Sequence, residues 1–318
     1  MGTLDKILEE INKANSIVIL THDNPDGDAV GTSLALYNAL KRYGKENVDV
    51  IIPECPETFL FLPGADNIKK SSECESYNLA IGIDCSNLNM LNGGNKYFEN
   101  SDHTVVIDHH NTNTMYGDLN FVNPDAPACA EVMIVALNSF NIDIDKDIGT
   151  CILAGIITDT GGFKSQTVTS ETFEFVANLL KKGINVSSVY RKVLLLKTKS
   201  AYELARAANN RLEFFYDGKI AYTYVTLEDY EKFGTSYGDH EGIVEVGRDI
   251  EGVEVSIFVR PIKGKGLKVS LRSNNKVDVD EIALLFGGGG HPKAAGFYIN
   301  GDMESVKKKV IDEVKRCL

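Results

Sequence analysis

The sequence predicts an α/β protein with two domains: an N-terminal domain that holds a parallel sheet with helices on both faces, and a smaller α/β C-terminal domain. In the first half, short β-branched runs alternate with amphipathic segments, which is typical of a parallel sheet covered by helices. At 318 residues and 43% hydrophobic content, the chain can fill two cores. We expect the N-terminal domain at residues 1–185, a mixed and charged connector at 186–200, and the C-terminal domain at 201–318.

Four short apolar runs in the first half are expected to form strands, at residues 16–20, 48–52, 79–83 and 104–107. Between the first two runs, apolar side chains recur at helical spacing and stop before Gly44, a residue that suits the end of a helix. Three more helices are expected at residues 129–140, 146–158 and 171–182.

The second half has the same kinds of element in a different order. We expect helices at residues 202–212, 279–286 and 303–317, and strands at 220–226, 253–259, 267–271 and 296–299. The glycine run 287–290 is expected to be a loop, because it is too flexible for a strand interior and too tightly flanked for a linker.

Composition and charge limit the classes of function that this chain can have. A net charge of -12 argues against wrapping of long nucleic acid, which depends on many phosphate contacts, but it allows a small anion held by a local basic patch. The 6 cysteines include no C-x-x-C pair and are expected to be reduced thiols. No signal sequence and no uncharged apolar run of ~18 residues is found, so we expect a cytoplasmic protein without membrane contact.

Potential metal ligands directly follow three of the four predicted strands of the first half. They occur in the run from His22 to Asp28, at Asp84, and in the triplet Asp108-His109-His110. Asp159 follows a further apolar run at residues 152–158. Because the carboxyl ends of parallel strands meet at one edge of the sheet, we expect these side chains to lie close together.

Carboxylates that gather in this way repel one another unless a cation lies among them, and oxygen ligands with a little imidazole suit Mn²⁺ or Mg²⁺. Each residue alone has a plainer interpretation. Asp26 or Asp28 could cap the helix that begins near Ala29, and Asp159 could simply end its helix. The coincidence of all of them at the ends of predicted elements favours a metal site.

The two motifs, residues 22–29 (HDNPDGDA) and Asp108-His109-His110, resemble the DHH phosphoesterase superfamily, and the glycine run before His291 resembles its associated C-terminal domain. Within the superfamily, the chain is similar to the oligoribonuclease and pAp phosphatase group. The resemblance implies two Mn²⁺ ions, with Mg²⁺ or other divalent ions left open. One ion would be held by His22, Asp26 and Asp84, and the other by Asp28, Asp84, His109 and Asp159.

The same resemblance implies roles for three catalytic residues. Asp84 would bridge the two ions, His110 would contact the phosphate, and Asp108 would orient a neighbouring imidazole. Hydrolysis would proceed by a two-metal hydroxide attack on phosphorus, without a covalent intermediate.

The second domain carries a basic stretch at residues 255–277 that contains no Asp or Glu. Its cations are Arg260, Lys263, Lys265, Lys268, Arg272 and Lys276. In so acidic a chain this is a local anion trap. We expect the second domain to face the metal crevice and to grip the part of the substrate that is not cleaved. The expected substrate-binding residues are Arg272, Ser273, Gly289, Gly290 and His291.

The expected function is hydrolysis of short RNA oligonucleotides, dinucleotides and slightly longer, to mononucleotides, and of 3′-phosphoadenosine 5′-phosphate (pAp) to AMP and phosphate. Hydrolysis of pApA or cyclic di-AMP, a non-catalytic nucleotide sensor, and a homodimer all stay open. Three other classes of protein are disfavoured. The chain lacks the Arg-Lys-Lys signature of a related pyrophosphatase and the G-x-G-x-x-G motif of a dinucleotide-binding oxidoreductase, and it is shorter than a RecJ-type exonuclease.

Overall fold

The computed structural model describes residues 2–91, 93–235, 239–240, 242–262 and 264–318. The chain divides into two compact units, Met1–Leu196 and Lys197–Leu318. The division falls within the stretch expected to be a connector. In the described part of the chain, no helix has the length and apolar character needed to cross a membrane.

Unit 1 is built on a six-stranded parallel sheet with the order β3-β2-β1-β4-β5-β6. The strands are β1 (Ile17–Thr21), β2 (Val48–Ile51), β3 (Ile68–Lys69), β4 (Leu79–Ile83), β5 (His103–Asp108) and β6 (Leu119–Val122). The central strands β1 and β4 are buried at every position, which explains their continuous apolar sequences. This sheet confirms the predicted fold class of the first half.

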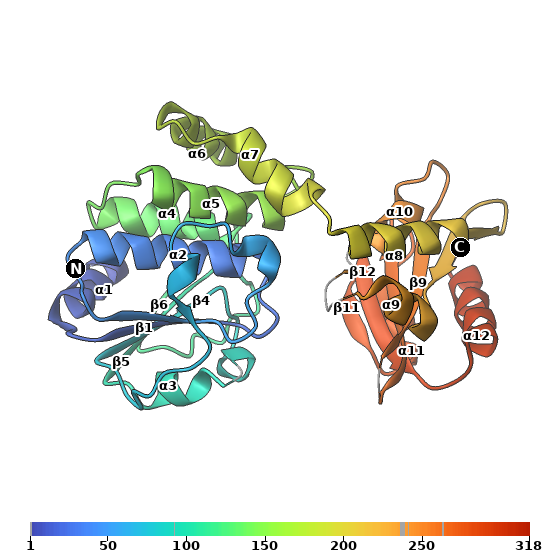
Figure 1. Cartoon of the computed structure of the whole chain (residues 1–318), viewed down its shortest axis with the longest axis horizontal. Coiled ribbons are helices and arrows are strands. Elements are labelled where there is room, and N and C mark those ends of the chain that lie inside the picture. The colour runs from blue at the N-terminus through green and yellow to red at the C-terminus, as the bar shows by residue number, and fades with distance from the viewer. Residues whose placement is uncertain (1, 92, 236–238, 241, 263) are drawn as a thin grey trace. The chain divides into compact units, whose positions relative to one another are not determined.

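Helices cover both faces of this sheet, as predicted (Figure 1). On one face pack α1 (Thr3–Lys13), α2 (Gly27–Arg42), α4 (Cys129–Ser139) and α5 (Lys146–Asp159). The other face is covered by the short α3 (Asn95–Glu99), whose Tyr97 and Phe98 pack against Val18 and Val106. The remaining helical segments are α6 (Ser170–Lys181), α7 (Val186–Tyr190), the π-helix η4 (Arg191–Leu195), and the short turns η1 (Glu57–Phe59), η2 (Ala65–Asn67) and η3 (Leu88–Leu91).

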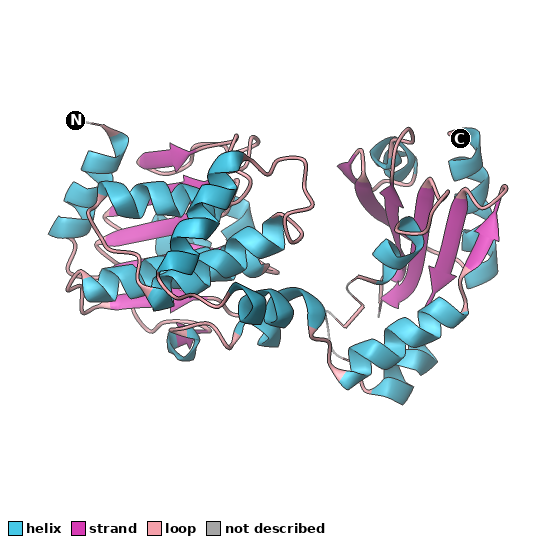
Figure 2. Cartoon of the chain, turned by 90° about the horizontal axis from the view of Figure 1, so that it is seen from above, coloured by secondary structure: helices cyan, strands magenta, loops and turns pink. Residues whose placement is uncertain are grey.

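Unit 2 contains a mixed six-stranded sheet with the order β11-β12-β10-β9-β8-β7, whose strands are seen in Figure 2. The strands are β7 (Glu213–Phe215), β8 (Ile220–Tyr224), β9 (Val255–Ile262), β10 (Gly266–Ser273), β11 (Gly289–His291) and β12 (Ala294–Ile299). The pair β8–β9 is parallel and the other pairs are antiparallel.

The two faces of this second sheet carry different helices. On one face, α11 (Val279–Leu285) and α12 (Met303–Arg316) enclose the main core of the unit. On the other, α8 (Lys199–Asn210) and α10 (Ile243–Arg248) pack around Phe258, with α9 (Leu227–Phe233) beside them. The predicted smaller α/β domain is therefore confirmed.

The expectation that the whole glycine run forms a loop is wrong. Gly289 and Gly290 begin β11, an edge strand in which Gly289 is opposite Gly296 and Gly290 is opposite Ala295 of β12. A Cβ atom at Gly290 would collide with the carbonyl oxygen of Ala294, so glycine is needed for this close pairing. Only the start of the run makes a turn, at Gly287 with φ of 74°.

Candidate metal centre

The structure brings together every residue that was predicted to form or support the metal site. His22 follows β1, Asp26 caps the N-terminus of α2, Asp84 follows β4, Asp108 ends β5 and Asp159 ends α5. The loops after three neighbouring parallel strands and the end of one helix thus meet at the carboxyl edge of the sheet.

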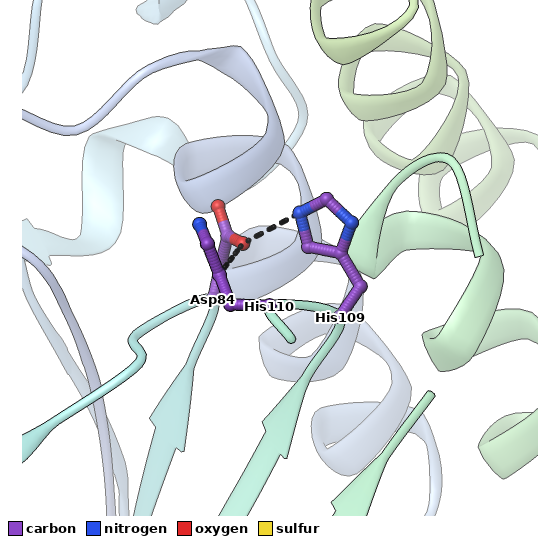
Figure 3. A group of neighbouring side chains, drawn as sticks. All are labelled: Asp84, His109 and His110. Carbon is purple, nitrogen blue, oxygen red and sulfur yellow. Dashed lines mark ion pairs between the residues drawn. The ribbon is translucent and has the colours of Figure 1, made fainter. Parts of the chain in front are cut away.

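Three groups of side chains in the described part of the chain place their potential ligand atoms within 4.8 Å of one another. They are His22 with Asp26 and Asp84; Asp28 with His109 and Asp159; and Asp84 with His109 and His110. The third group, drawn in Figure 3, links the other two, because it shares Asp84 with the first and His109 with the second.

Asp84 lies at the junction of these groups. Its Oδ1 atom is 3.4 Å from Nε2 of His109 and 3.6 Å from Nδ1 of His110 (Figure 3). This oxygen is buried and has no hydrogen-bond partner among the described residues. The backbone of Asp84 is in the left-handed region with φ of 54°, an unusual conformation for a residue other than glycine that aims the side chain at the cluster.

The lack of a hydrogen-bond partner for Oδ1 of Asp84 among the described residues indicates that the cluster is built for a cation. Burial, together with the charge of Asp28, raises the pKa of Asp84 well above its usual range. A buried carboxylate oxygen without a partner costs free energy, and a cation at this position would remove that cost. Carboxylate oxygens with two or three imidazoles fit Mn²⁺ or Mg²⁺ better than they fit a soft metal.

Asp28 is buried completely and is held by the N-terminus of α4. Its Oδ2 accepts a hydrogen bond from the backbone N–H of Cys129 at 2.6 Å, and its Oδ1 accepts from Ala130 at 3.0 Å. Burial, and then the charge of Asp159, raises the pKa of Asp28 to about 7. Burial, and then Asp26, likewise raises the pKa of Asp159 to about 7. These carboxyl groups repel one another as anions when no cation lies among them.

Two glycines allow α5 to carry Asp159 so close to Asp28. A Cβ atom at Gly155 of α5 would lie 2.6 Å from Oδ1 of Asp28, and one at Gly31 of α2 would lie 2.5 Å from the carbonyl oxygen of Cys151. Any side chain at either position would therefore push the two helices apart. Sequence reasoning missed this requirement, although the glycines inside these two apolar helices were a signal for it.

Two of the imidazoles are oriented by backbone carbonyl groups. Nδ1 of His22 lies 2.7 Å from the carbonyl oxygen of Asp23, and Nδ1 of His109 lies 3.1 Å from that of Ala126. Because carbonyl oxygens only accept, each Nδ1 carries the proton and the Nε2 lone pair is left for the cluster. Nε2 of His22 is 3.9 Å from Oδ2 of Asp84. This is the arrangement found around metal-binding histidines.

His110 is oriented in a different way, by a side-chain network. Its Nδ1 donates to Oδ1 of Asp108 at 2.7 Å, and Oδ2 of Asp108 accepts from Nδ2 of Asn113 at 2.6 Å. Burial alone would raise the pKa of Asp108, but the hydrogen bonds from His110 and Asn113 outweigh it and lower that pKa. The bond to Asp108 in turn raises the pKa of His110. Sequence reasoning missed Asn113, for which the spacing gave no signal.

The five predicted substrate-binding residues lie together in unit 2. Arg272 of β10 and His291 of β11 are both opposite Ala294 of β12. Nε of Arg272 is 2.9 Å from Oε1 of Glu245, while His291 is exposed. The hydroxyl group of Ser273 is buried and donates to the carbonyl oxygens of Val277 at 2.7 Å and Pro292 at 3.2 Å. In this conformation Ser273 thus anchors the segment that carries His291.

A parallel sheet with a His/Asp cluster at its carboxyl edge, followed by a mixed sheet with a glycine-rich edge strand, defines a phosphoesterase of the DHH class. The chain belongs to the DHH family. The model of the DHH family N-terminal domain matches residues 16–156, and the model of the DHHA1 domain matches residues 217–318.

Relatives match over nearly the whole chain. The bifunctional oligoribonuclease and PAP phosphatase NrnA of Thermus thermophilus is 32% identical, covering 98% of this chain and 94% of the relative. The protein of the same name from Bacillus subtilis is 26% identical, covering 92% of this chain and 91% of the relative. This places the chain among enzymes of the phosphoesterase class.

Solved structures agree on the fold. An exopolyphosphatase-related protein from Bacteroides fragilis matches with a TM-score of 0.90 and 28% identity, covering 98% of this chain and 94% of the other. RecJ of Thermus thermophilus, solved in complex with Mn²⁺, matches with a TM-score of 0.51 and 14% identity, covering 99% of this chain and 55% of RecJ. The likeness to RecJ shows the fold alone.

Proposed function

We propose that the protein hydrolyses short RNA oligonucleotides, dinucleotides and slightly longer, to mononucleotides, and pAp to AMP and phosphate. The observation that carries the proposal is the buried Oδ1 of Asp84, which has no hydrogen-bond partner among the described residues and lies between two His/Asp groups. The two substrates are those for which the Thermus thermophilus and Bacillus subtilis relatives are named.

The proposed cofactors are two divalent cations, with Mn²⁺ preferred. One ion would be held by His22, Asp26 and Asp84, and the other by Asp28, Asp84, His109 and Asp159. The observed proximity of these ligand atoms supports both sets. Bound in such a site, divalent ions lower the pKa of water and neutralise charge on a phosphoryl group.

His110 is the proposed phosphate contact of the protein itself. Its Nδ1–H is engaged by Asp108, so its Nε2 is free to donate to a non-bridging phosphate oxygen. The raised pKa of His110 favours the cation, which gives a charge-assisted hydrogen bond. Asp108 acts as a positioning residue that fixes the ring and stabilises its charge.

No protein nucleophile is proposed. Burial raises the pKa of Cys85 to about 11 and that of Cys129 well above its usual range, so both of these thiols beside the cluster stay protonated. Water is the attacking group in this account.

Unit 2 is proposed to hold the part of the substrate that is not cleaved, through Arg272, Ser273, Gly289, Gly290 and His291. The exposed ring of His291, the partly exposed Arg272 guanidinium and the glycine edge strand support this role. Replacement of His291 by Asn should raise KM for a dinucleotide much more than it weakens Mn²⁺ binding. Loss of metal with an unchanged KM would refute this role.

A substrate panel tests the proposal. Purified protein with Mn²⁺ is given pAp, an RNA dinucleotide, pApA, cyclic di-AMP, longer RNA and pyrophosphate. We expect phosphate from pAp and mononucleotides from the dinucleotide. Faster turnover of pApA or cyclic di-AMP would make second-messenger hydrolysis the function, and no turnover of any nucleotide would favour a sensor.

A further inference from the structure

One face of the sheet in unit 2 carries cations that the proposed function leaves unused. Along β10, Leu267, Val269 and Leu271 point into the core, so the alternate side chains point to the opposite face. That opposite face of β10 bears Lys268, Ser270 and Arg272, all partly buried. Arg272 forms an ion pair with Glu245, whereas Lys268 forms no ion pair with a carboxylate among the described residues.

Lys268 lies directly opposite another cation. In the antiparallel pair β9–β10, Lys268 is opposite Arg260. Like charges at directly opposed positions destabilise a sheet. Neither side chain forms an ion pair with a carboxylate among the residues that the structure describes, and Nε of Arg260 is buried there without a hydrogen-bond partner.

Among the described residues, two groups near Arg260 are neutral at pH 7, and the charge of Asp239 acts on both of them. Burial lowers the pKa of His240 to about 4, so this imidazole is neutral at pH 7. Burial raises the pKa of the Tyr230 hydroxyl group, which also stays neutral. Burial and the nearby Arg260 together lower the pKa of Lys268. A bound anion would offset the repulsion between the directly opposed Lys268 and Arg260.

The ammonium group of Lys268 lies beside Gly296 of β12, the strand that pairs with the glycine edge strand β11. Its Nζ is 4.4 Å from the ring centroid of Tyr298, and a Cβ atom at Gly296 would be 3.3 Å from the same Nζ. Gly296 is opposite Gly289 of β11. The absence of a side chain at Gly296 thus leaves room for this ammonium group next to the backbone of the glycine run. Tyr298 is half exposed, so part of its ring is open to a ligand.

We propose that Arg260 and Lys268 form an anion subsite for a phosphodiester group of the oligonucleotide other than the one hydrolysed, with Tyr298 as a stacking surface for the adjacent base. The inference rests on the proposed function and deepens it. Two cations suit the shared charge of a phosphodiester, and aromatic rings bind bases of any sequence. The subsite would favour substrates of three nucleotides over pAp.

Kinetics with matched variants test the subsite. Lys268→Gln and Arg260→Gln are compared with Lys276→Gln, which removes an exposed charge from the same basic stretch. We expect the first two variants to raise KM for a 5′-phosphorylated RNA trinucleotide at least tenfold more than they raise KM for pAp. An equal effect of Lys276→Gln, or equal effects on both substrates, would overturn the subsite.

Two further measurements distinguish a failure of the subsite from a failure of the proposed function, and ligand binding by Lys268 from a structural role. Binding of the trinucleotide in EDTA needs no turnover, and loss of one phosphate contact should reduce the salt dependence of log Kd by about 0.7. An unchanged slope and affinity would overturn the proposal even if no nucleotide is hydrolysed. The unfolding temperature of ligand-free Lys268→Gln should equal or exceed that of the unmodified protein. A lower value with unchanged affinity would show a structural role instead.

Discussion

Nδ1 of His110 donates a hydrogen bond of 2.7 Å to Oδ1 of Asp108, a carboxylate that is completely buried at the end of β5. Asp108 is thus removed from the cluster of ligand atoms, although it belongs to the same three-residue motif. One motif thus supplies a ligand candidate, the proposed phosphate contact His110, and the carboxylate that orients its ring.

We expect Asp108→Asn to lower kcat by roughly two orders of magnitude and to change its pH dependence. The amide has no negative charge, so the pKa of His110 falls and the cationic ring is lost at lower pH. The alkaline limb of the pH profile of kcat should move to lower pH, while the affinity for Mn²⁺ changes little. A lower kcat at every pH, with the alkaline limb at an unchanged pH, would contradict this role for Asp108.

Protonation and cation binding should compete at Asp28 and Asp159. The pKa of each is raised from 3.8 to about 7, so without metal the folded state binds more protons than the unfolded state between these values. The stability of the metal-free protein should therefore fall as pH rises from about 4 to 7. In EDTA, Tm at pH 7.5 should be lower than at pH 5.5.

Addition of Mn²⁺ should reverse this trend, because the cation replaces the protons. The increase in Tm on addition of Mn²⁺ should be greater at pH 7.5 than at pH 5.5. An increase in Tm that is independent of pH would show that the ion binds elsewhere.

Gly155→Ala should damage the metal centre through packing alone. The added Cβ atom would lie 2.6 Å from Oδ1 of Asp28, so either the carboxylate or α5 must move. We expect at least a tenfold loss of Mn²⁺ affinity by calorimetry. Gly149→Ala is the matched control, since its Cβ would collide with Ile184 in the core. It should lower Tm but preserve Mn²⁺ affinity, and a similar loss of affinity in both variants would contradict this account.

Asp229→Asn should destabilise unit 2. Asp229 accepts hydrogen bonds from both terminal nitrogens of Arg211, at 2.5 and 2.9 Å, and from the backbone N–H of Thr226 at 2.8 Å. Burial alone would raise the pKa of Asp229, but the bonds from Arg211 and Thr226 outweigh it and lower that pKa. We expect a loss of about 1–3 kcal/mol in urea unfolding at pH 7.

Because folding lowers the pKa of Asp229, the stability lost in Asp229→Asn should depend on pH. A carboxyl group whose pKa is lowered by folding stabilises the protein above its unfolded value near 3.8, and this contribution disappears as pH falls through the folded value. The difference between the unmodified protein and Asp229→Asn should therefore shrink below pH 4. A constant difference would mean that the carboxylate charge is not responsible.

The closeness of the ligand candidates could be predicted from the sequence, because their positions follow from local pattern and sheet geometry. Apolar runs identified β1, β4 and β5, and parallel strands bring the residues after them to one edge. Asp26 illustrates how two interpretations can both hold, since it caps α2 through the N–H groups of Asp28 and Ala29 and also lies in the cluster.

Other features depend on contacts that no local pattern reveals. The glycine run was expected to be a loop because glycine weakens a strand, yet pairing with β12, several residues later, makes part of it β11. The buried hydrogen bonds of Ser273 and the close approach at Gly155 are likewise tertiary features. Short elements such as α3 and β3 were missed because so few residues carry too little periodicity.

In the proposed two-metal site, Asp84 serves two cations at once. Mn²⁺ bound per chain is measured by calorimetry, together with hydrolysis of pAp and an RNA dinucleotide, for the unmodified protein, Asp84→Asn, and the exposed control Asp66→Asn. The account predicts two ions per chain and turnover for the unmodified protein and the control, with loss of both the second ion and turnover in Asp84→Asn. Substantial turnover by a folded Asp84→Asn protein, or two ions still bound to it, would contradict the account.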